Sequence, residues 1–503
     1  MQARPRREHI IPYPPTLDVH QREAAGRQAA DDARCPFTRV IEPEPSKTRS
    51  PLRWSDPFRV RSVWVPPVVL VAVLIVVMTL VYFGSVVNPP GHLHGLPVGV
   101  VNQDAGADIA GQHVNFGEQI SSGLIGSPAV SSKLALRPST LAQAKGRMDV
   151  AKEYTAVVIP PGFTNNLLAL AGVSRATSKP AVELLTNPRA GTLAVSLATG
   201  VLQPALSHAS GAIGQKLVPL ASAHPGRAAA SPVLADPVTV SEVPYKPPPS
   251  HSALGLSPFY IALLTTFCGF LGGIIVTTSI DAVLGYTATE IGPVWHQRQP
   301  VAISRVQTLI SKWVLAVPLA VILTTLMLFT AVVIFGMNSP DFLSLWLLCS
   351  FAAMVVAIGT LALFAALGTL GQLVALLIFV YLALASSGGT VPLEALGGFF
   401  RFLANFEPLR QILDGTRAIL YFDGSGAAGL TRAWVATAIG LVFWLALGLS
   451  ATAWYDRKRL YRMPPDLMRY VDRAVADYRR DQTALREQSA QPAAGDGEAA
   501  EAP

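Results

Sequence analysis

The sequence predicts an α-helical polytopic membrane protein with six transmembrane helices and an α/β extracytoplasmic domain between helices 1 and 2. Two observations predict this class. Charged residues make up only 14% of the 503 residues, and hydrophobic residues make up 51%, whereas a soluble globular domain carries about 25% charged residues. Apolar runs of about 20 residues, enough to cross a hydrocarbon core of about 30 Å, recur along the chain. A wholly soluble enzyme is therefore excluded.

The six apolar runs differ in how they are bounded. The first follows 62 largely hydrophilic residues, so we expect a signal anchor and not a cleavable signal peptide, whose charged region is short. Pro66 and Pro67 lie in its first turn, where proline costs little. Only a tight turn near Gly368 and Gly371 separates the fourth and fifth runs, which together are too long for one crossing. The predicted spans are 63–87, 257–283, 313–336, 342–366, 369–387 and 433–454.

Lys and Arg near the spans predict the orientation. The first 62 residues carry 12 basic residues, whereas 88–107 carry none and 237–256 carry only Lys246. Basic residues return in the 284–312 loop and directly after the last span. We therefore expect a plasma (inner) membrane protein with both termini and this loop in the cytoplasm, and with 88–256 and 388–432 facing outward. The net charge of +7 then reflects topology, and nucleic acid is not an expected partner.

The outward segment 88–256 is predicted to be a domain of its own. Short apolar runs ended by turn residues predict strands, and Ser, Thr or Pro before apolar-periodic segments predict helices between them. Strands that alternate with helices indicate a small α/β domain. A stretch rich in Pro, Ala and Ser, 222–252, is predicted to be an extended linker. The predicted strands are 96–101, 154–159 and 181–186, and the predicted helices are 108–124, 139–150, one from Phe163, and 190–219.

The two ends of the chain differ from the rest. Residues 1–62 form a basic region, and 1–50 have the Pro-, Arg- and Glu-rich composition of disordered segments. In the cytoplasmic tail 455–503, apolar residues at a spacing of three to four predict a short helix around 468–478, and the final 15 residues are predicted to be unstructured.

Residues that could carry catalysis are sparse. His92 and His94 make only half of a metal site, and we expect them to lie in a solvated loop at the membrane surface. Cys35, Cys268 and Cys349 are too far apart for a zinc motif. The sequence contains no HExxH, GxSxG or CxxC motif and no GxxxxGK[ST] phosphate loop. We therefore expect no catalytic residue, no cofactor and no metal, and any ATP would be bound by another polypeptide.

Ionisable residues inside the spans would mark a proton or ion route, and they are almost absent. Asp281, at the cytoplasmic end of the second span, is the candidate intramembrane carboxylate. It is either an interfacial group close to water or a relay or latch to a neighbouring helix. In the same span, Gly269 and Gly273 form a GxxxG pattern, which favours close helix packing.

Two connections between spans are candidate interaction sites. The cytoplasmic loop 284–312 is either an ordinary basic loop or a segment, helical in part, that docks a partner. In the outward connection 388–432, proline begins each of two short amphipathic helices, which indicates a re-entrant or interfacial hairpin or an amphipathic loop on the outer leaflet. Its charged side chains either pair with one another or face an aqueous path; they are Glu394, Arg401, Glu407, Arg410 and Arg417.

Three motifs in order resemble a known family. They are LPVGVVNQDAGA after the first span, AKEYTAVVIPPGFTNNL in the outward domain, and SSGGTVPLEALGGFFRFLANFEPLRQILDGTRAIL before the last span. They resemble phage-infection-protein-like membrane proteins, on the branch that contains the yeast nitrosoguanidine-resistance membrane protein. These proteins are similar to the permease subunits of type-2 ABC exporters. The resemblance covers about residues 60–455 and excludes the basic N-terminal extension and the Arg-rich C-terminal helix.

The resemblance implies roles for particular residues. Asn102, Asp104 and Gly106 would form the first turn of the outward domain. Glu290, with Trp295 and Arg298 of the same loop, would lie where exporters couple to an ATPase. The outer mouth would be shaped by the glycine- and proline-containing ends of the hairpin, namely Gly388, Gly389, Thr390, Pro392, Pro408, Leu409 and Arg410.

Few intramembrane charges and no nucleotide loop lead to one expectation and two alternatives. We expect an ABC-2-type permease-like efflux protein that moves an amphipathic or lipid-like compound or drug outward, as a homodimer among membrane lipids, energised by a separate ATP-binding-cassette subunit. One alternative is a membrane-anchored surface receptor whose outward domain binds a ligand, an envelope partner or a phage. The other is proton-driven efflux that depends on Asp281.

Overall fold

The computed structural model describes residues 61–109, 112–173, 180–223, 229 and 231–490. The predicted disorder of 1–50 and of the final residues lies outside these ranges. Within them, five helices are long and apolar enough to cross a membrane. They are α2 (Arg61–Val86), α10 (Ser257–Val283), α11 (Arg305–Phe329, continued by a π turn η3, Thr330–Ile334), α12 (Phe342–Leu367) and α17 (Leu430–Arg457).

Local capping residues determine where these helices begin. Ser304 and Gln307 form a capping box at the start of α11, which satisfies backbone N–H groups that a helix end leaves free. This start lies eight residues before the predicted boundary at 313, because polar first turns carry no apolar signal. Asp341 accepts a hydrogen bond from Ser344 N at 3.0 Å and begins α12. Gly368 ends α12 with a φ of +62°, a conformation that glycine adopts without strain.

A shorter apolar helical run follows that turn, where the fifth span is predicted. It consists of α13 (Leu370–Leu376), the π turn η4 (Leu377–Leu382) and α14 (Ala383–Ser386). The whole run, Leu370–Ser386, is shorter than the five long helices. The predicted turn between the fourth and fifth apolar runs is therefore present, and the described residues contain five full-length candidate spans.

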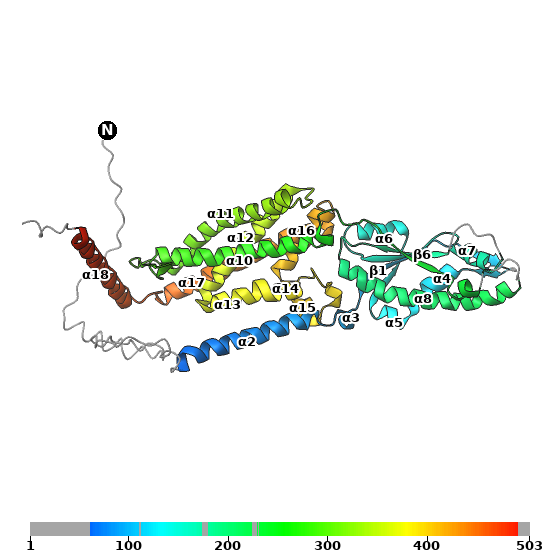
Figure 1. Ribbon diagram of the computed structural model, residues 1–503, viewed down its shortest axis with the longest axis horizontal. Helices are drawn as coiled ribbons and strands as arrows, with labels where there is room; N and C mark the ends of the chain where they lie inside the picture. Colours follow the sequence, from blue (N-terminus) through cyan, green and yellow to red (C-terminus); the bar gives the residue numbers. More distant parts are fainter. Residues whose placement is uncertain (1–60, 110–111, 174–179, 224–228, 230, 491–503) are drawn as a thin grey trace, which may run out of the picture. The chain divides into compact units, whose positions relative to one another are not determined.

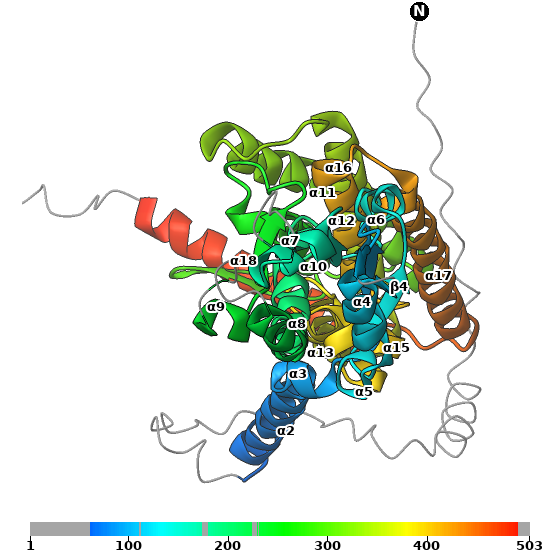
Figure 2. The ribbon, with the colours of Figure 1, turned by 90° about the vertical axis from the view of Figure 1, so that its right-hand side faces the viewer.

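Helix α12 forms the centre of the helical bundle. It packs against α10, α11, α17 and α16 (Pro408–Tyr421), as two views of the molecule show (Figure 1, Figure 2). Its residues are apolar on all sides, and most of them are buried. A helix that is hydrophobic all round is expected to be enclosed by others, and α12 is enclosed in this way.

The segment 88–256, which we call the outward domain after its predicted side, contains a five-stranded mixed sheet with the order β4-β1-β5-β6-β7. Strand β1 pairs in parallel with β4 and β5, β5 pairs antiparallel with β6, and β6 pairs in parallel with β7. The three predicted strands are confirmed. The strands are β1 (Leu96–Asn102), β4 (Leu134–Pro138), β5 (Thr155–Ile159), β6 (Ala181–Thr186) and β7 (Thr239–Pro244).

Two predictions for this domain are wrong. The segment 222–252 is not simply a linker, because its residues Thr239–Pro244 form the edge strand β7, which tolerates proline at its last position. The predicted helix over 108–124 begins only at Phe116, because Asn115 caps it by accepting from Glu118 N at 2.7 Å. The residues before it form a small hairpin of β2 (Ala107–Ile109) and β3 (Gln112–Val114).

Helices cover the sheet and complete its core. The long helix α8 shares a hydrophobic core with β1 and β5, formed by buried residues such as Leu202, Val98 and Val157 (Figure 1). The predicted cap of the 139–150 helix is confirmed, because Thr140 and Gln143 form a capping box. The helices are α3 (Pro89–His92), α4 (Phe116–Gly126), α5 (Pro128–Ser131), α6 (Leu141–Met148), α7 (Phe163–Leu170), α8 (Thr192–Ser222) and α9 (Ser231–Ala235).

The remaining elements connect or follow the long helices. The 388–432 connection contains the two predicted short helices, α15 (Gly398–Leu403) and α16. The 284–312 loop contains a β-hairpin, β8 (Thr289–Ile291) with β9 (Val294–His296), where a short helix was considered. The predicted tail helix is present as α18 (Pro465–Ala490). Single 3₁₀ turns lie at Ala253–Gly255, Leu393–Ala395 and Gly426–Ala428.

Candidate functional site

Asp281 lies in the last turn of α10, at the end of the bundle that carries the 284–304 loop; we call it the loop end. Its side chain is 6% exposed. Lys312 of α11 places Nζ 2.8 Å from Oδ1, and Arg462, which follows α17, donates from Nη1 to Oδ1 at 2.5 Å and from Nη2 to Oδ2. One carboxylate therefore joins three segments that are far apart in the sequence.

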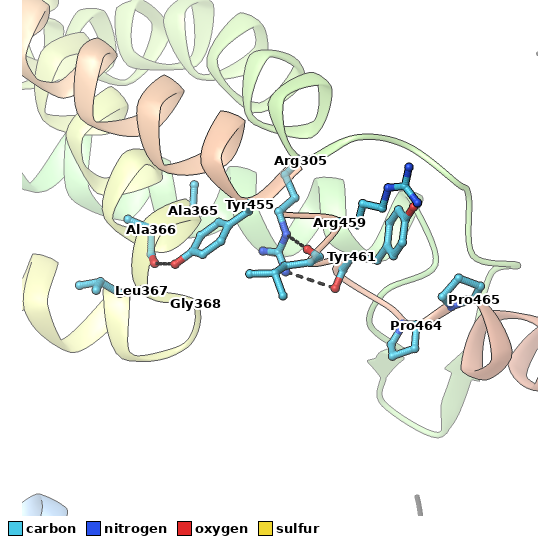
Figure 3. Close-up of a pocket in the computed structure, with 11 residues that line it drawn as sticks. Arg305, Ala365, Ala366, Leu367, Gly368, Tyr455, Arg459, Tyr461, Pro464 and Pro465 are labelled. Carbon is cyan, nitrogen blue, oxygen red and sulfur yellow. Dashed lines mark hydrogen bonds between the residues drawn. The ribbon is translucent and has the colours of Figure 1, made fainter. Parts of the chain in front are cut away.

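A second set of contacts at the loop end centres on Arg305, the first residue of α11. Its guanidinium donates from Nε to Leu460 O at 2.7 Å and from Nη2 to Tyr461 O at 3.3 Å, and it lies 4.9 Å from the Tyr455 ring centroid (Figure 3). Tyr455 in turn donates to Ala366 O at 2.6 Å. These contacts hold the end of α17 against α11 and α12.

The N-terminus of α11 has an acidic partner of its own. The carboxylate of Asp456 accepts from the backbone N–H of Arg305 at 3.0 Å and from that of Val306 at 3.1 Å. A carboxylate is stabilising at this position because the N-terminus of a helix carries partial positive charge.

A pocket of about 510 Å³, lined by both polar and apolar side chains, opens among these helix ends. Its walls come from α10, α11, α12, α17 and the residues around Thr287, Thr369 and Arg462. We call it the threonine pocket, because six threonines line it together with Asp281, Lys312, Arg305 and Arg462; they are Thr277, Thr278, Thr287, Thr308, Thr369 and Thr452. Within a bundle of apolar helices, charged and hydroxyl side chains that converge on one cavity mark a candidate binding site.

The residues predicted to couple to an ATPase lie together on the β8–β9 hairpin. Glu290 and Trp295 are backbone partners in the strand pair, Arg298 lies two residues beyond β9, and both Glu290 and Arg298 are exposed. The hairpin base is held by Gln297, whose Nε2 donates to Gly285 O at 2.9 Å. Tyr286, whose pKa is raised by burial, stacks against the Arg462 guanidinium at 4.8 Å. Tyr286, three residues before β8, therefore links the base of the hairpin to the Asp281 ion pairs through Arg462.

The predicted turn of the outward domain is built around Asp104. Asn102 accepts from Asp104 N at 3.0 Å, and Gly106 has a φ of +77°. The Asp104 carboxylate, 6% exposed, accepts from Thr164 N at 3.2 Å, Thr164 Oγ1 at 2.5 Å and Gly117 N at 3.4 Å. It therefore ties the end of β1 to the first turns of α4 and α7.

Replacing this carboxylate should loosen the outward domain. We expect Asp104→Ala to destabilise it by about 2–4 kcal/mol, because buried donors of Thr164 and Gly117 lose their acceptor. Limited proteolysis and thermal unfolding measure the loss. The matched control is Asp108→Ala, since Asp108 pairs with His113 at the surface and should change stability by less than about 0.5 kcal/mol. Equal effects of the two substitutions would contradict this role.

In the outward hairpin, the predicted pairing of acidic and basic residues takes another form. Arg410 and Arg417 pair with Asp414, at 3.1 Å and 4.0 Å, and not with Glu394 or Glu407. The spacings of four and three residues along α16 bring these groups onto one helix face. Asp414 is not among the predicted site residues, although the i, i+4 rule could have identified it.

Arg401 instead binds backbone and a histidine. It donates to Leu393 O at 3.3 Å and to Leu396 O at 3.0 Å, and its Nη1 lies 2.6 Å from His94 Nε2. His94 N also donates to Glu394 O at 3.0 Å. The outward domain and the hairpin therefore meet at His94, which the sequence indicated only as a solvated loop residue.

The glycines and prolines predicted to shape the outer mouth lie at close approaches and helix starts. Gly388 has a φ of +72°, and a Cβ added there would lie 2.6 Å from Arg410 Nη1. A Cβ on Gly389 would overlap the Phe259 ring of α10. Pro392 precedes the 3₁₀ turn, Pro408 begins α16, and Leu409 is fully buried, whereas Thr390 is exposed. These residues pack the hairpin onto the bundle.

Two carboxyl groups of the hairpin are buried without a full set of partners. Oε2 of Glu394 and of Glu407 has no hydrogen-bond partner among the described residues. Burial raises the pKa of both, and it raises the pKa of Glu407 to about 8. For Glu394, nearby Arg410, Arg401 and Arg417 partly oppose the rise.

The raised pKa of Glu407 predicts a pH dependence of stability. In the unfolded chain the group titrates near 4.5, so between pH 4.5 and about 8 the folded state binds more protons, and stability falls as pH rises. Between pH 5.5 and 8.5 we expect the wild-type protein to lose on the order of a few kcal/mol of its free energy of unfolding. Glu407→Gln should remove this loss. Thermal unfolding at both pH values measures it. The control Asp472→Asn, at an exposed position on α18, should keep the pH dependence of stability of the wild-type protein. If Glu407→Gln also keeps it, Glu407 is not the group that causes this dependence.

Comparison with known proteins places the chain in a family. Residues 67–440 match the model of a family described as "Protein of unknown function (DUF3533)". The chain belongs to this family. The match includes all three motifs quoted above, the outward domain and the hairpin, and it ends within α17. No curated protein and no solved structure matches the chain.

The family match excludes part of the loop-end site. Arg462, Asp456 and Tyr455 lie beyond the matched residues, whereas Asp281, Lys312 and Arg305 lie within them. Sequence analysis named Asp281 but missed Lys312 and Arg462 as its partners. Lys312 was counted among the basic residues of the 284–312 loop, and only the tertiary structure shows that it and Arg462 meet one carboxylate.

Proposed function

We propose that this member of the DUF3533 family is an export permease for an amphipathic or lipid-like compound. The observation that carries the proposal is the threonine pocket, a cavity with both polar and apolar lining among helix ends that the Asp281 ion pairs hold together. A few ion pairs between helices form a contact that rigid-body movement can break and remake. A pathway with few charged groups suits apolar cargo better than free ions.

The finer features of this proposal follow the predicted topology. The run Leu370–Ser386 serves as the fifth of six spans, both termini lie in the cytoplasm, and the loop end faces the cytoplasm of the plasma membrane. The chain works as a homodimer with a separate ATP-binding-cassette subunit, which engages the exposed β8–β9 hairpin through Glu290 and Arg298. The contact between Tyr286 and Arg462 supports this coupling, because it links the hairpin to the pocket.

Efflux of fluorescent amphiphiles from cells that express the chain tests the proposal. We expect the full-length protein to lower the cellular accumulation of at least one probe in a panel of anionic, neutral and cationic lipid-like dyes. Arg462→Gln should lower the efflux rate at least tenfold while surface expression stays normal. Unchanged accumulation of every dye would contradict the permease proposal.

The energy source is tested separately. Glu290→Ala should reduce efflux without changing unfolding temperature, because Glu290 is exposed, and Glu183→Ala, an exposed change in the outward domain, serves as its control. Normal efflux in cells that lack every candidate ATPase would refute coupling to an ATP-binding cassette. We do not propose proton-driven efflux through Asp281, because two cations hold that carboxylate.

One observation favours a second function, that of a surface receptor. The outward domain has a groove of about 720 Å³ between α4, α5 and α8, with an apolar floor that includes Leu124, Val130 and Ile213 and with Lys133 and Lys216 in its lining. If the chain is a receptor, deleting 95–250 abolishes binding of its ligand or phage while no transport is observed. Robust efflux by the purified protein would refute a function as receptor alone.

A further inference from the structure

The threonine pocket carries more positive than negative charge. Its lining contains Lys312, Arg305 and Arg462 but, among described residues, Asp281 as its one acidic side chain. Asp281 already accepts from both Lys312 and Arg462. The nearby Asp456 is engaged by the backbone N–H groups that begin α11. An anion would therefore complete the charge balance of the pocket, whereas a cation would meet three positive groups.

The hydroxyl groups of the pocket point to the same kind of ligand. Thr277 is 7% exposed, and its Oγ1 has no hydrogen-bond partner within the described chain, although it is buried. Thr308 and Thr452 donate to carbonyl groups of their own helices, at 2.9 Å and 2.7 Å. A buried hydroxyl without a partner is costly, and a phosphate or carboxylate oxygen in the pocket would accept from it. Arg, Lys and hydroxyl donors are the groups that recognise phosphate in proteins.

A second pocket, which is also lined largely by apolar groups, adjoins the first. It has a volume of about 600 Å³ and shares Arg305, Ala365 and Gly368 with the threonine pocket. Figure 3 shows Leu367 and Gly368 on one side and Pro464 and Pro465 on the other, with Arg305 and Tyr455 between them. A charged head in the threonine pocket would therefore have apolar walls beside it for the start of a hydrocarbon chain.

We propose that the threonine pocket binds the phosphate head of an anionic amphiphile, with the adjoining pocket holding the first part of its apolar chain. That this amphiphile is the exported cargo rests on the proposed function. Its binding to the pocket does not, and it is tested separately. Arg462 and Lys312 supply charge, and Thr277 supplies the unpaired donor. Of the two cations, Arg462 is the one that can turn towards a bound ligand, because its side chain is 30% exposed whereas that of Lys312 is 8% exposed.

The test uses the purified full-length protein in dodecyl maltoside and follows its thermal unfolding as dodecyl phosphate is added. We expect saturable stabilisation by dodecyl phosphate and none by dodecyltrimethylammonium, which has the same chain and the opposite charge. Inorganic phosphate should stabilise only at concentrations at least tenfold higher. Equal potency of inorganic phosphate would overturn the amphiphile part of the proposal, and no stabilisation by either phosphate would overturn the site.

Three variants locate the binding. Thr277→Val keeps the shape of the side chain and should weaken the apparent Kd for dodecyl phosphate by about tenfold, since it removes one hydrogen bond to a charged group. Arg462→Gln should weaken it at least as much while Lys312 still neutralises Asp281. The control is Thr437→Val, because Thr437 is a buried threonine of α17 that donates to Ala433 O at 2.7 Å outside the pocket. An unchanged Kd in Thr277→Val and Arg462→Gln would overturn the assignment.

Transport of a fluorescent dodecyl phosphate derivative from proteoliposomes separates this inference from the proposed function. Binding that depends on Thr277 and Arg462, without transport by the protein and its ATPase, refutes the permease and leaves the site standing. Transport that is unchanged in both variants refutes this site and leaves the permease standing.

Discussion

Asp281→Ala is expected to destabilise the protein by about 3–5 kcal/mol, the cost of removing one partner from a buried ion pair. The cost arises from Lys312, whose side chain is only 8% exposed and which would be left as an uncompensated charge among apolar helices. Arg462 contributes less, because its more exposed guanidinium can turn towards water. Thermal unfolding of the full-length protein in detergent measures the change.

A double variant separates loss of charge balance from loss of packing. Asp281→Asn combined with Lys312→Met removes both buried charges, and we expect it to recover most of the stability, because a buried pair replaced by apolar groups is often nearly neutral. Asp466→Asn is the matched surface control, since its pair with Arg469 is largely exposed and worth less than about 1 kcal/mol. A cost for Asp281→Ala no larger than for Asp466→Asn would show that the ion pairs do not hold the loop end together.

Gly269→Ala is expected to disrupt the packing of α10 against α12 with a comparably large effect. A Cβ at Gly269 would overlap Ala353 O and lie 2.7 Å from Val356 Cβ, and the backbone oxygen cannot move without shifting α12. Forcing an extra carbon into a closely packed helix pair costs about 1–3 kcal/mol and sometimes more. We expect lower yield, a lower unfolding temperature and reduced transport together, because α12 contacts most of the bundle.

The same helix provides the control for this substitution. At Gly272 an added Cβ would meet only the ends of Leu323 and Leu319, at 3.4 Å and 3.9 Å. Gly272→Ala should therefore be neutral or stabilising by up to about 1 kcal/mol, because alanine favours helix more than glycine does. If Gly269→Ala and Gly272→Ala behave alike, close approach of α10 and α12 at Gly269 is not what fixes the bundle.

The GxxxG pattern predicts that a helix packs closely against a neighbour, but it does not predict which neighbour. Gly269 and Gly273 were expected to permit close helix packing, and a Cβ on either would meet α12, at Val356 or Thr360. The pattern could not show which helix is the partner, because any apolar helix would fit a glycine face. The tertiary structure identifies α12, whose position at the centre of the bundle depends on the other helices as well.

In the candidate sites, the sequence likewise indicates Asp281 and Asp104 but not the residues that they contact. The sequence marks Asp281 because a carboxylate among apolar residues is costly, and it marks Asp104 because Asn, Asp and Gly form turns. Their partners lie 31 and 181 residues from Asp281, at Lys312 and Arg462, and 60 residues from Asp104, at Thr164. No local spacing rule covers such distances, so neither the ion pairs nor the threonine pocket could be predicted.

The sequence by itself determined the membrane class, the boundaries of most long helices and three strands of the outward sheet, because hydrophobic run length, periodicity and turn residues act over a few residues. Only the tertiary structure determines that β4 and β7 form as edge strands, that β8 and β9 form a hairpin, and which cations pair with Asp281. Weak strands such as Thr239–Pro244 form only when a neighbouring strand supplies hydrogen bonds, and buried charges persist only where distant partners meet them.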